Sequence, residues 1–219
     1  MPGEMPQVVE AQLALAQMYL DRGEASTALD WLRSAARSGE PRALNMLGRA
    51  YERGWGTVAD ARSAAAYFRR AADGGDVWAL FNLADLYCRG EGVEQDDTVA
   101  YALYAQAARK GLAKALNMLG LFHEEGRGVP RSRVAARQFF EAGAEAGDCW
   151  AAFNAARLLV EGGEVARALP LMDKALETGF EDFHRHMAGL LLDHPDPRLR
   201  AMAVRARALA GRAGRETVP

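Results

Sequence analysis

The sequence predicts an all-α protein, a right-handed α-solenoid of helical hairpins. Alanine supplies 44 of the 219 residues, and it has the highest intrinsic helix propensity. A six-residue segment returns every 36 residues, beginning at Ala43, Ala79, Ala115 and Ala151. Within each copy, small and apolar residues follow the three- and four-residue spacing of an amphipathic helix. Such a repeat is the signature of a stacked helical array.

The repeat divides the chain into consecutive hairpins. We expect a single repeat domain over 8–212, with flexible termini at 1–7 and 213–219. The expected hairpins are about 8–39, 40–75, 76–111, 112–147 and 148–179, followed by 180–212 as a C-terminal cap. The end units are shorter, because the interval from Tyr19 to Tyr51 and the interval from Leu159 to Leu191 both fall short of the full period. Atypical end units are expected where an array meets water.

Each central hairpin carries paired glycines in its connection. We expect the first glycine to end the first helix in a left-handed conformation and a polar side chain to cap the second helix. The glycines are Gly54, Gly90 and Gly126, and the caps are Asp60, Asp96 and Ser132. A phosphate-binding loop is not indicated, because its Lys-Ser/Thr ending is absent and helices flank the connection on both sides.

Composition narrows the function classes. The net charge of -2 offers no overall attraction to nucleic acid. Only Cys88 and Cys149 are present, which favours a reducing compartment. The sequence has no signal-peptide pattern and no membrane-spanning run, so we expect a cytoplasmic protein. Arginine outnumbers lysine by 24 to 3, which suits a GC-rich genome.

The recurring motif resembles the Sel1-like repeat, a relative of the tetratricopeptide repeat. It reads Ala-x-x-x-Leu-Gly-x-x-Tyr-x-x-Gly-x-Gly-Val-x-x-Asp, then Ala-x-x-aromatic-x-x-x-Ala-Ala-x-x-Gly, and it extends from about Glu10 to Glu177. The resemblance implies a concave groove, lined by the first helix of each hairpin, that binds other proteins. It implies no shared catalytic residues.

The resemblance also implies which residues line that groove, namely the first-helix positions that packing does not use. The candidate partner-binding residues are Arg42, Asn45, Arg49, Trp78, Phe81, Asp85, Arg89, Lys114, Asn117, Trp150, Phe153 and Arg157.

Each group of candidates has an alternative role. Phe81 and Phe153 fit packing between repeats, whereas Trp78 and Trp150 are either binding anchors or packing residues. The basic residues either meet partner carboxylates or form local pairs with Glu52, Asp85, Glu124, Glu125 and Glu161. Asn45 and Asn117 could hydrogen-bond an extended peptide.

No catalytic or metal motif is legible, so we expect no enzyme, metal or cofactor. His184 and His186 are two residues apart on a helix and cannot share a metal. His123 takes the tyrosine position of its hairpin as a packed or half-buried substitute.

The sequence therefore predicts a non-catalytic adaptor or scaffold that binds a protein or peptide. The alternative is a stoichiometric inhibitor, immunity-type or chaperone subunit that clamps one folded bacterial enzyme or effector. The arginine-rich C-terminal helix also fits a membrane or nucleic-acid surface, but a cap is the simpler role. The oligomeric state is not predicted.

Overall fold

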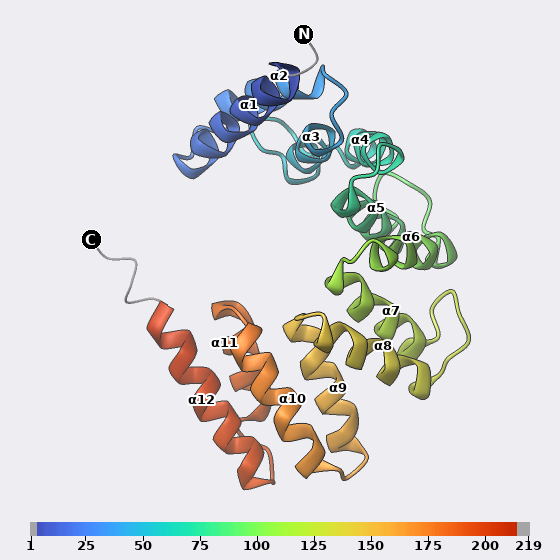
Figure 1. Cartoon of the computed structure of the whole chain (residues 1–219), viewed down its shortest axis with the longest axis vertical. Helices are drawn as coiled ribbons and strands as arrows, with labels where there is room; N and C mark the ends of the chain where they lie inside the picture. The colour runs from blue at the N-terminus through green and yellow to red at the C-terminus, as the bar shows by residue number, and fades with distance from the viewer. Residues whose placement is uncertain (1–3, 214–219) are drawn as a thin grey trace. The chain divides into compact units, whose positions relative to one another are not determined.

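The structure is a computed structural model that describes the backbone of residues 4–213 and the side chains of residues 7–211. Within that range every regular element is an α-helix, which confirms the predicted fold class (Figure 1). The terminal segments predicted to be flexible lie mostly outside the described residues, and their described parts, 4–7 and 213, are helical. The helices are α1 (Glu4–Asp21), α2 (Ala25–Ala36), α3 (Pro41–Arg53), α4 (Ala61–Asp73), α5 (Val77–Arg89), α6 (Asp97–Arg109), α7 (Ala113–Glu125), α8 (Arg133–Glu145), α9 (Cys149–Glu161), α10 (Val165–Thr178), α11 (Glu181–Leu191) and α12 (Pro197–Ala213).

The chain forms two compact units, which we call unit 1 (residues 1–112) and unit 2 (residues 113–219). Unit 1 contains α1 to α6, and unit 2 contains α7 to α12. Inside each unit, consecutive helices pair as hairpins. The second helix of one hairpin packs on the first helix of the next at α2 and α3, α4 and α5, and α8 and α9. A single domain over 8–212 stays a prediction.

The connections are built as the glycine pattern predicts. Gly54 and Gly90 end α3 and α5 with φ of 71° and 68°, a left-handed conformation that only glycine adopts readily. Asp60 and Asp96 then cap α4 and α6, each accepting bonds from two backbone N–H groups. Gly126 and Ser132 take the same roles before α8.

In the first two connections the second glycine, Gly56 or Gly92, is required for a separate reason. A Cβ on Gly92 would lie 2.2 Å from the backbone oxygen of Ala61, at the start of α4. A Cβ on Gly56 would lie 2.3 Å from the backbone oxygen of Ala25, at the start of α2. These connections therefore pack directly on the preceding hairpin, and only glycine leaves room for that approach.

The two helices of a hairpin meet through a glycine and an aromatic ring. A Cβ on Gly48 would lie 2.7 Å from the ring of Phe68, and a Cβ on Gly120 would lie 2.3 Å from the ring of Phe140. Both rings are fully buried. The missing side chain on one helix thus makes the space that the ring of its partner helix fills.

The tyrosines Tyr51, Tyr67 and Tyr87 are half-buried. Tyr51 is half-buried and stacks on Tyr67 with ring centroids 5.5 Å apart. The hydroxyl of Tyr87 accepts a hydrogen bond from Arg69 at 3.2 Å. His123 takes the same position in α7, as predicted, where it is half-buried and stacks on Phe139.

Candidate partner-binding site

In unit 1 the first helices α1, α3 and α5 are joined by polar pairs. Arg42 on α3 binds both carboxylate oxygens of Glu10 on α1 at 2.9 Å. Arg89 on α5 meets Glu52 on α3 at 2.8 Å. The Glu52 contact is the local pairing considered as the alternative to partner binding. Both pairs are exposed on at least one side, so each adds only ~0.2–1 kcal/mol of stability.

Asn45 lies on α3, between the first helices of unit 1. It is 6% exposed, and its side-chain oxygen accepts a hydrogen bond from Asn82 Nδ2 on α5 at 2.9 Å. Little of Asn45 is open to an incoming peptide, and its side-chain oxygen is already bound to α5. Asn45 therefore acts in the structure as a link between hairpins, a role that satisfies a buried polar group.

Trp78 and Phe81, one turn apart on α5, differ in exposure. Phe81 is 3% exposed and packs edge-on against the ring of Tyr104. Trp78 is 51% exposed and touches the edge of Phe81 at 6.3 Å between centroids. Phe81 thus takes the packing alternative, whereas Trp78 presents a large apolar surface to solvent.

Asp85 belongs to a polar cluster between α5 and α6. It accepts a hydrogen bond from the hydroxyl of Tyr104, which also lies 3.7 Å from Cys88 Sγ. Burial, followed by the Asp85 charge, raises the pKa of Tyr104 far above its ordinary value. The phenol therefore stays protonated and serves as a donor to the carboxylate.

Arg49 and Lys114 interact with an aromatic ring and with a carboxyl group, respectively. Arg49 places its guanidinium 5.3 Å from the centre of the Trp55 ring, a cation–π contact. Lys114 on α7 lies near enough to Asp148 to lower the pKa of that carboxyl, although burial outweighs it and the net pKa is raised.

Unit 2 repeats the asparagine link. Asn117 on α7 is 8% exposed and accepts a hydrogen bond from Asn154 Nδ2 on α9 at 2.9 Å. The offset of 37 residues equals that of the pair in unit 1. The sequence repeat contains all four asparagines, but their mutual pairing follows only from the way the first helices lie side by side.

Arg157 on α9 is the best-anchored cation of the candidates. It donates to Glu124 on α7 at 2.6 Å and to Glu161 at 2.7 Å. Burial disfavours its charge, but the hydrogen bonds to these two carboxylates more than offset that cost and raise the pKa of Arg157. Local pairing, one of the two predicted alternatives, is what the structure shows for this residue.

Trp150 and Phe153 are both engaged inside unit 2. Trp150 meets the ring of Phe183 edge-on at 4.9 Å between centroids and also contacts His186. Phe153 is 5% exposed and packs against the same Phe183. Trp150 is therefore a half-buried packing residue, unlike its repeat equivalent Trp78.

A cavity of about 250 Å³ opens beside Phe153 and Arg157. It brings two predicted residues together with side chains from α10, α11 and the segment that follows α11. The lining residues are Phe153, Arg157, Val160, Glu161, Met172, Leu190, Leu191 and His194. Leu190 is 55% exposed at this site. The sequence repeat could not identify Leu190 or His194, because they belong to the atypical last hairpin.

The cysteines and histidines of the described residues were also candidates for chemistry. No cluster of three or more His, Cys, Asp or Glu side chains could hold a metal ion there. Burial raises the pKa of the Cys149 thiol to about 11, which disfavours a reactive thiolate. His184 is buried against the carbonyl of Leu176, while His186 is exposed. In the described part of the chain, no helix combines the length and apolar character needed to cross a membrane.

Stacked helical hairpins with an apolar cavity define the class of protein as an α-helical repeat protein. The Sel1 repeat profile matches residues 9–40, 41–76, 79–112 and 113–148, more than half of the chain. The protein therefore belongs to the Sel1 repeat family. Members of this family generally mediate protein–protein interactions and are typically non-catalytic.

Solved structures support the same assignment. A Sel1 repeat protein from Oxalobacter formigenes is 26% identical, with a TM-score of 0.77 over 94% of this chain and 88% of that one. A protective antigen of uropathogenic Escherichia coli is 25% identical, with a TM-score of 0.69 over 96% of this chain and 50% of that one. An immunity protein from Pseudomonas aeruginosa shares the fold at 13% identity, with a TM-score of 0.65 over 93% of this chain and 81% of that one. A search of curated proteins gave no match.

Proposed function

We propose that this protein is a non-catalytic adaptor or scaffold that binds a partner protein or peptide through the exposed faces of its first helices. The observation that carries this proposal is the cavity beside Phe153 and Arg157. Its volume of about 250 Å³ suits one or two apolar side chains, which is the scale of a peptide anchor rather than of a large metabolite.

The lining of the cavity indicates what the partner brings. Val160, Leu190 and Leu191 offer apolar surface, while Arg157 and Glu161 form a polar edge. Because Arg157 already binds two carboxylates, a partner carboxylate would have to displace one of them. We therefore expect burial of a leucine or aromatic side chain to supply most of the affinity, at about 25 cal/mol per Å² of apolar surface.

Trp78 gives unit 1 a contact of its own. Half of its side chain is exposed, and exposed tryptophan is the residue type most enriched among interface residues with large energetic effects. We propose that Trp78 packs against the same partner. The polar rim of that contact would then include Arg42, Arg49, Asp85, Arg89 and Lys114.

Affinity purification with quantitative mass spectrometry tests the proposal. We compare the wild type with Leu190→Asp, which places a carboxylate at the cavity, and with Val134→Asp as the matched control. Val134 is 68% exposed on α8 and is not part of the cavity lining. We expect one partner to be lost about tenfold or more with Leu190→Asp and retained with Val134→Asp. Equal recovery by all three proteins would refute the cavity as the binding site.

Binding measurements with the purified partner then distinguish an adaptor that recognises a peptide from a clamp that binds a folded protein. A short segment of the partner that binds as tightly as the whole partner supports peptide recognition in the cavity. If only the folded partner binds, with a large negative heat-capacity change, the protein is a clamp of the inhibitor or immunity type. The immunity protein of Pseudomonas aeruginosa shows that this fold occurs in proteins of that second kind.

A further inference from the structure

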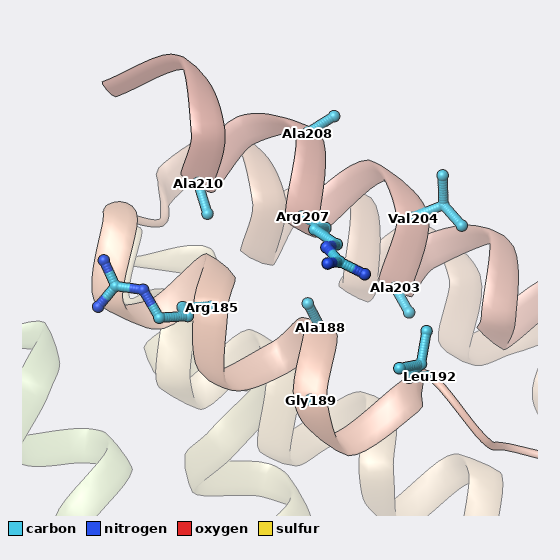
Figure 2. A pocket seen from close by; sticks show the side chains of 9 residues that line it. All are labelled: Arg185, Ala188, Gly189, Leu192, Ala203, Val204, Arg207, Ala208 and Ala210. Atoms are coloured by element: carbon cyan, nitrogen blue, oxygen red, sulfur yellow. The ribbon is translucent and has the colours of Figure 1, made fainter. Parts of the chain in front are cut away.

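The last hairpin of unit 2 has a second apolar site, which is lined only by residues of that hairpin. A groove of about 660 Å³ runs between α11 and α12 (Figure 2). We call it the end groove. Its lining residues are Arg185, Ala188, Gly189, Leu192, Ala203, Val204, Arg207, Ala208 and Ala210. None of them lines the cavity beside Phe153.

The repeat explains why this surface is apolar. The offset from the start of α9 to the start of α11 equals the offset from the start of α10 to the start of α12. Each residue of the end groove therefore has an equivalent in the preceding hairpin, one offset earlier in the sequence. These equivalent residues lie on the surface of that hairpin that faces α11. The equivalent residues are Phe153, Ala156, Arg157, Val160, Leu171, Met172, Ala175, Leu176 and Thr178.

Part of that earlier surface is covered by α11, and the rest borders the cavity beside Phe153 and Arg157. Phe153, Met172 and Leu176 belong to one buried cluster with Phe183 and Met187 of α11. Met172 is 1% exposed, whereas its equivalent in the end groove, Val204, is 64% exposed. The end groove therefore has the shape and position of a seat for one more helix, and no described element fills it.

The charges around the end groove indicate what kind of helix fits. Arg185 stands where the preceding hairpin has Phe153, and Arg207 stands where it has Ala175. In Figure 2 the side chain of Arg207 lies between α11 and α12. Arg185 is ion-paired with Glu181 and Asp182 of α11, so its charge is already balanced. No ion pair to Arg207 is found among the described side chains, and the sequence of α12 has no acidic residue, so Arg207 is the cation left for a partner carboxylate.

We propose that the end groove docks an amphipathic helix of a partner protein, with small apolar residues on one face and glutamate or aspartate along its edges. The partner helix takes the place on α11 and α12 that α11 takes on α9 and α10. A second copy of this chain is a poorer occupant, because symmetric pairing would bring Arg207 of both copies into one interface without a carboxylate from α12 to balance them. This site is separate from the cavity of the proposed function.

Synthetic helices of about 15 residues, held helical by a hydrocarbon staple, test the proposal by fluorescence anisotropy. The acidic probe has a stripe of Leu and Ala flanked by Glu. The basic probe has Lys in place of Glu, and the scrambled probe loses the stripe. We expect the full-length protein to bind the acidic probe at least tenfold more tightly than either control, and more weakly at high salt.

Two exposed substitutions locate the site. Val204→Asp should weaken binding of the acidic probe about tenfold or more, whereas the control Val134→Asp should not. Arg207→Glu should weaken the acidic probe and strengthen the basic probe, an exchange of preference that loss of folding cannot produce. Equal binding of all three probes, or binding unchanged in both Val204→Asp and Arg207→Glu, would overturn the proposal.

Sedimentation velocity over a range of protein concentrations tests the competing occupant. We expect a monomer at every concentration. A dimer that forms with rising concentration and disappears in Val204→Asp would assign the end groove to a second copy and overturn the acidic-helix proposal.

Discussion

Single residues in this protein have effects that depend on backbone conformation as much as on side-chain chemistry. Gly92 and Gly111 both have positive φ, of 71° and 91°. A Cβ on Gly111 would meet nothing within 4 Å, whereas a Cβ on Gly92 would run into the backbone of Ala61. The two glycines therefore separate the cost of a left-handed conformation from the cost of a collision.

We expect Gly111→Ala to lower the free energy of unfolding by ~1–2 kcal/mol, the cost of a left-handed alanine. Gly92→Ala should lower it by about 2–5 kcal/mol, because α4 must also move away. Chemical denaturation of both variants measures the difference. Equal losses would mean that the connection does not pack on α4 as described.

The N-cap carboxylate of α9 makes stability depend on pH. Asp148 accepts a hydrogen bond from the N–H of Ala151, but burial raises its pKa above the ordinary value of 3.8. Between those two pKa values the folded protein holds more protons than the unfolded chain. Stability from this group is therefore present at low pH and is lost as pH rises through that window.

Asp148→Asn keeps an oxygen acceptor and removes the titration. We expect the variant to gain stability relative to the wild type as pH rises from about 3 to about 7. Urea denaturation at both values measures this change. If Asp148→Asn instead becomes less stable relative to the wild type as pH rises, attraction between the carboxylate and the helix N-terminus outweighs the effect of burial.

At the scale of elements, each hairpin depends on a match between a small residue and a large one. Gly48 lies against Phe68, and Gly120 lies against Phe140. At the equivalent positions in the third hairpin the chain has Ala84 and Tyr104, where the tyrosine hydroxyl binds Asp85. The helices can thus keep their register while the identity of the pair changes.

We expect Phe68→Ala to lower the free energy of unfolding by ~3–5 kcal/mol, because the ring is fully buried. Tyr51→Ala should cost about half as much, since Tyr51 is half-buried and stacks on Tyr67. Thermal and denaturant melts of the two variants check the order. A larger loss of stability for Tyr51→Ala than for Phe68→Ala would contradict the assignment of Phe68, rather than Tyr51, to the core.

Periodicity predicts the elements well, because it depends on positions that every hairpin must share. Gly54 and Asp60 could be assigned to the end of one helix and the cap of the next, since those roles follow from φ and from unpaired N–H groups. Site residues are less predictable. Trp78 and Trp150 have the same place in the repeat, yet only Trp150 meets Phe183 of α11. The burial of Trp150 depends on the last hairpin, α11 and α12, which departs from the repeat.

At the scale of the whole molecule, stability is expected to be local. Unit 1 and unit 2 each contain three hairpins with their own buried clusters, and stacked repeats gain most of their stability from nearest neighbours. We therefore expect a fragment of residues 113–219 to remain helical by circular dichroism and to melt cooperatively. A fragment without helical signal would show that unit 2 requires unit 1 in order to fold.

Site-specific photo-crosslinking in cells tests most directly that the protein binds a partner through its first-helix faces. A photoreactive amino acid replaces Leu190 at the cavity, Trp78 on α5 or, as a control, Val134 on α8. We predict that positions 190 and 78 crosslink to the same protein and that position 134 does not. Crosslinks to that protein from position 134 alone, or none from 190 and 78, would contradict the account.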